Sequence, residues 1–349
     1  MLRILILCLA LTTAGAAAAQ RCDYRQPPPS EAMAEAEKMR KEGSAPFALI
    51  MAMREITKKE PDNALAWRWR GEAEAAGGDL RSGLEATTKA IDLDPCNLAT
   101  RVARAAIAER KGELRLAYGD YTAILAQQPR NATILRLRGD LLMGAAEFTA
   151  AVADYDAALA TGSEGEDLLL NHGGMMQELG RFKDAIADYN RILARDKDNV
   201  EALVARGYSQ FMLADYAAAE PDLASGATLN ANAAAWTFLA RARLGKADAA
   251  RAFVEATKKL PRPSWIGVVA ELLEAGAADE RIFAAAGDDA ERRCDVFFYL
   301  GELALAKNDK TRAKDMFEKG ADACPKDPIR TNGSLREYVA MTEELKRMK

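Results

Sequence analysis

A pattern of residues that recurs every 34 positions constrains this chain more than any other feature. The stretch 166–199 shows it most clearly, because Gly180 divides it into two segments whose apolar residues are three and four positions apart. That spacing is typical of amphipathic helices, and a glycine suits the left-handed backbone that follows a helix C-terminus. The stretch therefore predicts two helices joined by a short turn.

The same unit fits the sequence six times without an insertion. Its copies begin at residues 30, 64, 98, 132, 166 and 200. Small residues prevail at the eighth and twentieth positions, where they would let paired helices approach closely. Larger residues prevail at the seventeenth and twenty-fourth positions, where they would fill the space between neighbouring hairpins. Pro61, Pro95 and Pro129 stand at the thirty-second position, and a proline cannot continue the helix before it because it has no N–H group.

This pattern resembles the tetratricopeptide repeat family, whose period is 34 residues and whose signature combines aromatic, Leu-Gly, Tyr, Ala and Pro positions. The copy at 64–97 carries matching residues at Trp67, Gly71, Gly78, Ala90 and Pro95. The resemblance implies an all-α fold, a right-handed superhelical solenoid of helical hairpins. Such a solenoid can accommodate 349 residues, because each repeat contacts only its neighbours.

We expect five segments along the chain. They are a signal peptide at 1–19, a Pro-rich segment at 20–29, six in-register repeats at 30–233, a degenerate helical region at 234–293, and a C-terminal repeat with a capping helix at 294–349. Within the degenerate region, the sequence after Ala275 is not expected to form a regular second helix.

The first nineteen residues have the pattern of a secretory signal peptide. Arg3 precedes an apolar run, and alanines at 17–19 supply the small residues that a signal peptidase requires. We expect cleavage near Ala19, a periplasmic mature protein and no membrane span in it. A secreted or lipid-anchored protein is the alternative, although Cys22 follows Arg21, which departs from the lipoprotein pattern.

Four cysteines remain after that cleavage, and an even number in an exported chain indicates disulfides. Within the repeat-like unit 294–327, Cys294 would begin the first helix and Cys324 would end the second. These two ends are neighbours in an antiparallel hairpin, so we expect a disulfide between them. A second pair, Cys22 with Cys96, then follows by elimination.

Composition and motifs argue against most chemistry. The formal charge of −4 and the absence of a basic run do not favour nucleic acid or anionic membrane surfaces as partners. The single histidine, His172, falls at the seventh position of its copy and is expected to be a core or groove-edge residue. Because the sequence has neither a phosphate-binding loop nor several metal ligands grouped together, we expect no enzyme, no cofactor and no metal.

The resemblance implies that the first helix of each repeat lines a binding groove, mainly at its second, fifth, ninth and twelfth positions. The expected groove residues are Arg68, Arg136, Leu170, Val204, Tyr208 and Phe211. An extended segment with an acidic part and an apolar part would suit such a groove. Alternatively, the apolar residues only seal neighbouring hairpins.

We therefore expect a protein- or peptide-binding adaptor or scaffold of the bacterial cell envelope. The alternative function is recognition of a small molecule or glycan at the aromatic end of the groove.

Overall fold

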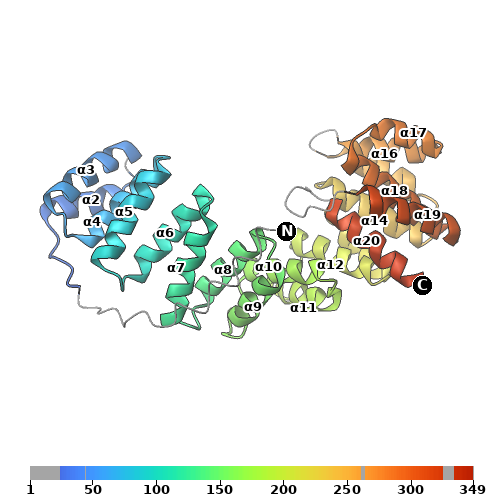
Figure 1. The fold of residues 1–349 in the computed structure, drawn as a ribbon. Helices are drawn as coiled ribbons and strands as arrows, with labels where there is room; N and C mark the ends of the chain where they lie inside the picture. Colours follow the sequence, from blue (N-terminus) through green and yellow to red (C-terminus); the bar gives the residue numbers. More distant parts are fainter. Residues whose placement is uncertain (1–23, 44, 261–263, 325–333, 349) are drawn as a thin grey trace. The chain divides into compact units, whose positions relative to one another are not determined.

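The protein is helical throughout the part of the chain that the structure describes. The computed structural model describes residues 24–43, 45–260, 264–324 and 334–348, and in these ranges it has nineteen α-helices and no strand (Figure 1). The expected all-α solenoid of helical hairpins is confirmed. The expected signal peptide and Cys22 lie outside the described residues. No helix in the described ranges is long and apolar enough to cross a bilayer.

The chain divides into two compact units, Met1–Leu141 and Leu142–Lys349. In the first unit each helix from α2 to α7 packs against the next, and the first helices of neighbouring hairpins also touch, as α4 and α6 do (Figure 1). Its helices are α2 (Glu31–Lys41), α3 (Pro46–Lys59), α4 (Ala64–Ala76), α5 (Leu80–Leu93), α6 (Leu98–Lys111) and α7 (Leu114–Gln127), followed by α8 (Ala132–Gly144), which runs across the boundary.

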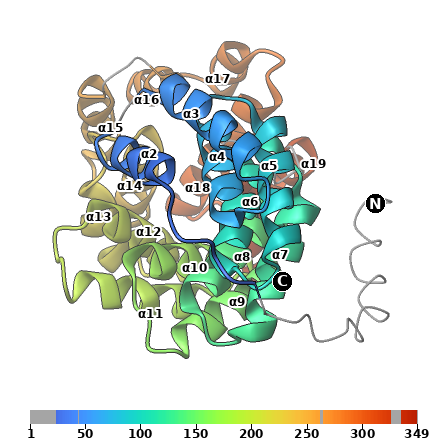
Figure 2. The same ribbon diagram turned by 90° about the vertical axis from the view of Figure 1, so that its left-hand side faces the viewer.

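The second unit repeats this packing and then departs from it. Figure 2 shows α10, α11 and α12 as neighbours. The helices are α9 (Phe148–Leu159), α10 (Glu166–Glu178), α11 (Phe182–Leu193), α12 (Val200–Met212), α13 (Tyr216–Ala224), α14 (Ala231–Arg243), α15 (Ala249–Lys258), α16 (Trp265–Glu274), α17 (Asp279–Ala286), α18 (Ala290–Ala306), α19 (Lys310–Ala323) and α20 (Ser334–Arg347).

The period of the sequence is also the period of the helix starts. The second helices of the six hairpins begin at Pro46, Leu80, Leu114, Phe148, Phe182 and Tyr216, which are 34 residues apart. Asparagines one period apart precede several of the first helices. The side chains of Asn63, Asn97 and Asn199 each accept a hydrogen bond from the backbone N–H three residues on. Such a cap stabilises a helix by about 1 kcal/mol, which explains why these helices begin in register.

Close approach within a hairpin depends on the eighth position. A Cβ atom on Gly173 would lie 2.7 Å from Cε1 of Tyr189, and one on Gly301 would lie 2.3 Å from Cε1 of Phe317. In both hairpins the aromatic ring of the second helix therefore occupies the space that a side chain on the first helix would need. This is the small-against-large packing that the repeat pattern predicts.

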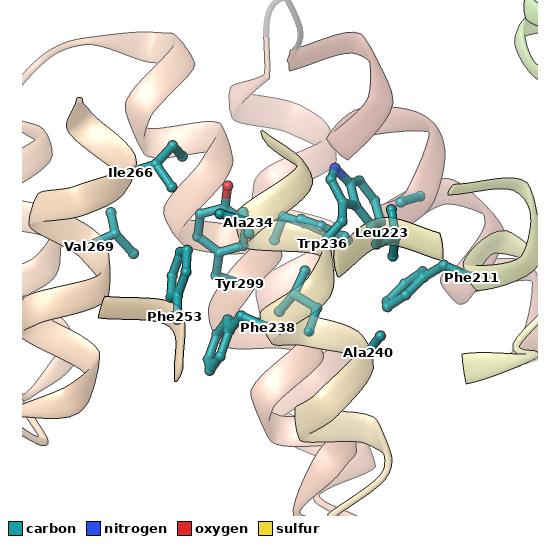
Figure 3. Close-up of a cluster of buried hydrophobic side chains, with 14 of the residues drawn as sticks. Phe211, Leu223, Ala234, Trp236, Phe238, Ala240, Phe253, Ile266, Val269 and Tyr299 are labelled. Carbon is teal, nitrogen blue, oxygen red and sulfur yellow. The ribbon is translucent and has the colours of Figure 1, made fainter. Parts of the chain in front are cut away.

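Aromatic side chains form a continuous core from α12 to α18. The indole of Trp236 is 2% exposed and meets the rings of Tyr208 and Phe211 edge-to-face, at centroid distances of 4.9 and 5.0 Å. Phe238 stacks on Phe253 at 4.8 Å. Figure 3 shows Trp236 and Phe238 on α14, with Phe211 and Phe253 on either side. Burial of such rings is a large stabilising contribution.

The degenerate region is more regular than the sequence predicts. The segment after Ala275 contains a short helix, α17, which buries Ile282 and Ala286 against Val296 and Leu300 of α18. The expectation of an irregular segment is therefore wrong for these residues. A helix of eight residues is marginal on its own in water, so this packing against α18 is what stabilises it.

The C-terminal hairpin brings its two cysteines together. The Sγ atoms of Cys294 and Cys324 lie at disulfide distance, 1.98 Å, with the Cα atoms 4.8 Å apart. The pairing that the hairpin geometry predicts is therefore present in the structure. The second predicted pair includes Cys22, which lies outside the described residues.

Candidate functional site

A pocket of about 510 Å³ opens between α10 and α12 in the second unit. We call it the α10–α12 pocket. Its apolar walls come from Leu170 on α10, from Val200 and Val204 on α12, and from Leu229 in the turn after α13. Its polar lining includes Asn171, Gln177, Glu201 and Asn230. The pocket thus combines a partly apolar wall with a few polar groups, which is the usual composition of a recognition site.

The pocket exists because the sixth hairpin is shortened. Its second helix, α13, has nine residues, whereas the second helices α5, α7, α9 and α11 have 12–14. Pro221 lies inside α13, and an interior proline weakens a helix because it removes a backbone donor. Residues 225–230 then form a turn that lies over α12. Leu229 in this turn is 63% exposed.

The α10 side of the pocket is left open by a glycine. Gly174 occupies the ninth position of its repeat, and a Cβ atom there would have no heavy atom within 4 Å apart from its own helix and chain neighbours. One turn further along, Nε2 of Gln177 donates to the carbonyl oxygen of Ala205 at 2.7 Å and to Oγ of Ser209 at 2.8 Å. These bonds tie α10 to α12, so the two walls of the pocket are held in place while the space beside Gly174 remains available.

The two hairpins that form the pocket have more acidic than basic residues. Residues 166–233 contain eleven Asp and Glu but only six Lys and Arg. Glu201 lines the pocket, is exposed, and forms no ion pair within the described part of the chain. A carboxylate close to the apolar side chains of the pocket favours a ligand that carries a positive charge beside an apolar group.

Two of the six predicted groove residues, Leu170 and Val204, meet in this pocket. Tyr208 and Phe211 do not, because they are only 3% and 1% exposed and seal α12 against Trp236. The prediction that these two rings offer a binding surface is wrong, and the alternative, that they seal neighbouring hairpins, describes them correctly.

The two predicted groove arginines are paired within their own helices. Nε of Arg68 lies 3.5 Å from Oε1 of Glu72, and Nη1 of Arg136 lies 2.6 Å from Oδ2 of Asp140. Each pair joins residues four positions apart, so each positive charge is largely compensated before a partner arrives. This pairing weakens the case for an acidic partner.

Sequence reasoning missed a buried polar contact at the single histidine. His172 is buried, and its Nδ1 lies 2.7 Å from Oδ2 of Asp188 on α11. A signal for it was present in the sequence. A basic residue recurs at the seventh position and an aspartate at the twenty-third, as in Arg104 with Asp120 and Arg206 with Asp222.

A protein-family model agrees with this architecture. The tetratricopeptide repeat family model matches residues 51–95 and 177–235. A search of curated protein sequences found no match. Similar solved structures include a tetratricopeptide repeat protein from Parabacteroides merdae, at 19% identity and TM-score 0.47 over 80% of this chain and 98% of that one. PilF of Pseudomonas aeruginosa is 18% identical, with TM-score 0.48 over 61% of this chain and 97% of that one. PilW, described as a type IV pilus biogenesis factor, is 21% identical, with TM-score 0.46 over 56% of this chain and 92% of that one.

The stacked helical hairpins place the chain among the α-solenoids. Its 34-residue register and the family model matched at residues 51–95 and 177–235 give it the architecture of tetratricopeptide repeats.

Proposed function

We propose that the protein is a non-enzymatic adaptor that holds an extended segment of a partner protein in the α10–α12 pocket. The observation that carries the proposal is the open space beside Gly174, between the apolar side chains of Leu170 and Val204. An apolar side chain of the partner would enter there and lose contact with water, which contributes roughly 1.5–3 kcal/mol for a leucine-sized group.

The chemistry of the rim indicates what should flank that apolar side chain. Glu201 would attract a Lys or Arg of the partner, and the excess of carboxylates over cations along 166–233 would favour its approach. The proposed ligand is therefore an extended segment with an apolar residue beside a basic one. This replaces the acidic segment that the sequence led us to expect.

The alternative function, glycan or small-molecule recognition by aromatic residues, loses support. Sugar rings are commonly recognised by stacking on exposed aromatic faces, whereas Tyr208, Phe211 and Phe238 are buried. The described residues of the α10–α12 pocket include one aromatic side chain, Tyr189, whose ring is already packed against Gly173.

The proposed location is the bacterial periplasm, as part of a scaffold of the cell envelope. Two observations support it: the signal-peptide pattern at 1–19 and the pairing of Cys294 with Cys324. Disulfides persist in oxidising compartments such as the periplasm and are rare in the cytosol. Mass spectrometry of protein from its own host should find a mature N-terminus near Gln20, without lipid. Retention of Met1, or a diacylated Cys22, would refute this location.

A displayed library of random peptides tests the binding proposal. Selection on the wild-type protein, with removal of peptides that also bind a Gly174→Leu variant, should enrich sequences with an apolar residue next to Lys or Arg. The leucine side chain fills the open space, so only pocket-dependent peptides should survive. Enrichment of acidic sequences, or of none, would count against the proposal.

A further inference from the structure

A basic residue at the seventh position ties each of several hairpins to the one before it. The guanidinium of Arg206 donates to both carboxylate oxygens of Asp222, at 2.6 and 2.9 Å, within its own hairpin. Its Nη1 also donates to Oδ1 of Asn190, at 2.7 Å, on α11 of the preceding hairpin. One side chain therefore joins three helices.

The same arrangement occurs one hundred and two residues earlier, or three periods, in the first unit. Arg104 donates to both oxygens of Asp120 at 2.8 Å and, through Nη1, to Oγ1 of Thr88 at 3.2 Å. In both cases the preceding hairpin supplies a neutral oxygen. We call this three-helix contact the seventh-position clamp.

His172 occupies the clamp between α9 and α10, and its surroundings differ. Nδ1 faces Asp188 of its own hairpin at 2.7 Å, as an arginine would. On the other side, Nε2 lies 3.2 Å from Oδ1 of Asp156 on α9. This nitrogen is buried, and within the described residues it has no hydrogen-bond partner of suitable geometry. Here the preceding hairpin supplies a carboxylate instead of a neutral oxygen.

The number of protons on the imidazole decides whether this clamp can be complete. An arginine is always charged and always has donors for both neighbours. A neutral imidazole has one N–H, so it can donate to only one of the two aspartates and turns a lone pair toward the other. The imidazolium has two N–H groups and can donate to both.

Charged groups face His172 from two neighbouring helices. Asp156 and the edge of the Tyr155 ring, at a centroid distance of 6.4 Å, face it from α9. Asp188 faces it from α11, and the other oxygen of that carboxylate lies 3.6 Å from Nη1 of Arg191. The helix α12 meets α10 through Gln177 and Ser209, which are uncharged. Two carboxylates therefore surround the imidazole, with one arginine at the far side of one of them.

We propose that the α9–α10 junction is a pH-dependent clamp, closed when His172 is protonated and loosened when it is neutral. Histidine is the side chain that changes charge between about pH 5 and about pH 8. The α9–α10 junction would therefore respond to pH in this range, whereas the arginine clamps would not. The proposal rests on hairpin contacts and does not depend on what the α10–α12 pocket binds.

Hydrogen exchange at several pH values, corrected for the intrinsic exchange rate, tests the clamp. Between about pH 5 and about pH 8, protection of amides in α9 and α10 should fall about fivefold, the size of one lost hydrogen bond. Amides of α4 and α5 should not change. In His172→Arg the fall should disappear. In Asp156→Thr, which restores the neutral oxygen of the other clamps, it should shrink.

A second measurement keeps the test valid if a variant folds poorly. Because His172 is the only histidine in the chain, tag-free protein gives one set of imidazole NMR signals. These should change from the charged to the neutral form over the pH range in which the exchange rises. Equal protection of wild-type α9 and α10 at both ends of the range would overturn the proposal. So would an undiminished fall in folded His172→Arg, or an imidazole that titrates without any change in exchange.

Discussion

Gly226 lies so close to Val204 that a Cβ atom at residue 226 would come within 2.5 Å of Cγ2 of the valine. This contact lets the turn after α13 lie over α12, and it places Leu229 and Asn230 beside the α10–α12 pocket. The corresponding residue of the fifth repeat is Ile192, inside a regular helix. A glycine at this point of the sixth repeat is therefore a requirement of the pocket wall.

Replacing Gly226 with Ala should destabilise the protein by roughly 1–3 kcal/mol, because the stiff valine cannot move aside without strain. Urea denaturation measures the change. The double variant Gly226→Ala with Val204→Ala should recover part of the loss, since the shorter side chain removes the clash. A single Gly226→Ala variant as stable as wild type would mean that the turn is not packed as described.

Truncating Tyr208 should show that it belongs to the core. Tyr208→Ala should lower the free energy of unfolding by roughly 3–5 kcal/mol, as expected when a large buried ring is removed. Tyr208→Phe keeps the ring contact with Trp236 and should cost much less. If Tyr208→Ala unfolded at the wild-type urea concentration, the ring would be a surface group after all.

The contrast between Tyr208 and Leu170 shows what the sequence could and could not predict. The period, the helix starts and the small-against-large packing followed from residues such as Gly173 and Tyr189, because they depend on contacts within one hairpin. Which side of a first helix is exposed depends on the next hairpin, and Trp236, in a part of the chain where the register slips, covers Tyr208. The pocket itself arises from the shortened α13. Because this helix departs from the 34-residue pattern, the pattern could not predict the pocket.

The pair Cys294–Cys324 should be oxidised in exported protein. Peptide mapping without reductant should recover the two cysteines in one linked peptide. In the chain-entropy account, closing a loop of this length contributes about 3–4 kcal/mol, so reduction should loosen α18 and α19 more than α10 to α12. The variant with both cysteines changed to Ala is the matched control, and its α18 and α19 should not respond to reductant. Free thiols at both positions would contradict the pairing.

Stability should fall as pH rises because of Asp295. Burial raises the pKa of its carboxyl to about 7 from an ordinary 3.8; Glu291 and Asp289 add to the rise, and the hydrogen bond from Trp265 opposes it. Between pH 3.8 and about pH 7, the carboxyl of Asp295 is protonated in the folded chain but ionised in the unfolded chain. The free energy of unfolding should therefore decrease, by roughly 1–3 kcal/mol, as pH increases through that range.

The variant Asp295→Asn isolates this contribution, since its amide is neutral at every pH and can still accept from Trp265. Its stability should depend less on pH than that of wild type. The comparison is needed because burial also raises the pKa of Glu302, to about 8, against the opposing effect of Arg243. Glu302 therefore also lowers the free energy of unfolding as pH rises. Identical pH profiles for the variant and wild type would show that Asp295 is not held in its protonated form.

The most direct test of the binding account is calorimetric titration of three proteins with a library-selected peptide that carries an apolar residue beside Lys or Arg. Gly174→Leu fills the pocket, whereas Gly119→Leu in α7 makes the same change at an exposed helix position where a Cβ atom also meets nothing. Both variants should be slightly more stable than wild type, by about 0.5–1 kcal/mol, because leucine favours a helix more than glycine does. The account predicts that wild type and Gly119→Leu bind equally well, and that Gly174→Leu binds at least about tenfold more weakly, a difference of about 1.4 kcal/mol. Equal affinity for all three proteins would contradict it.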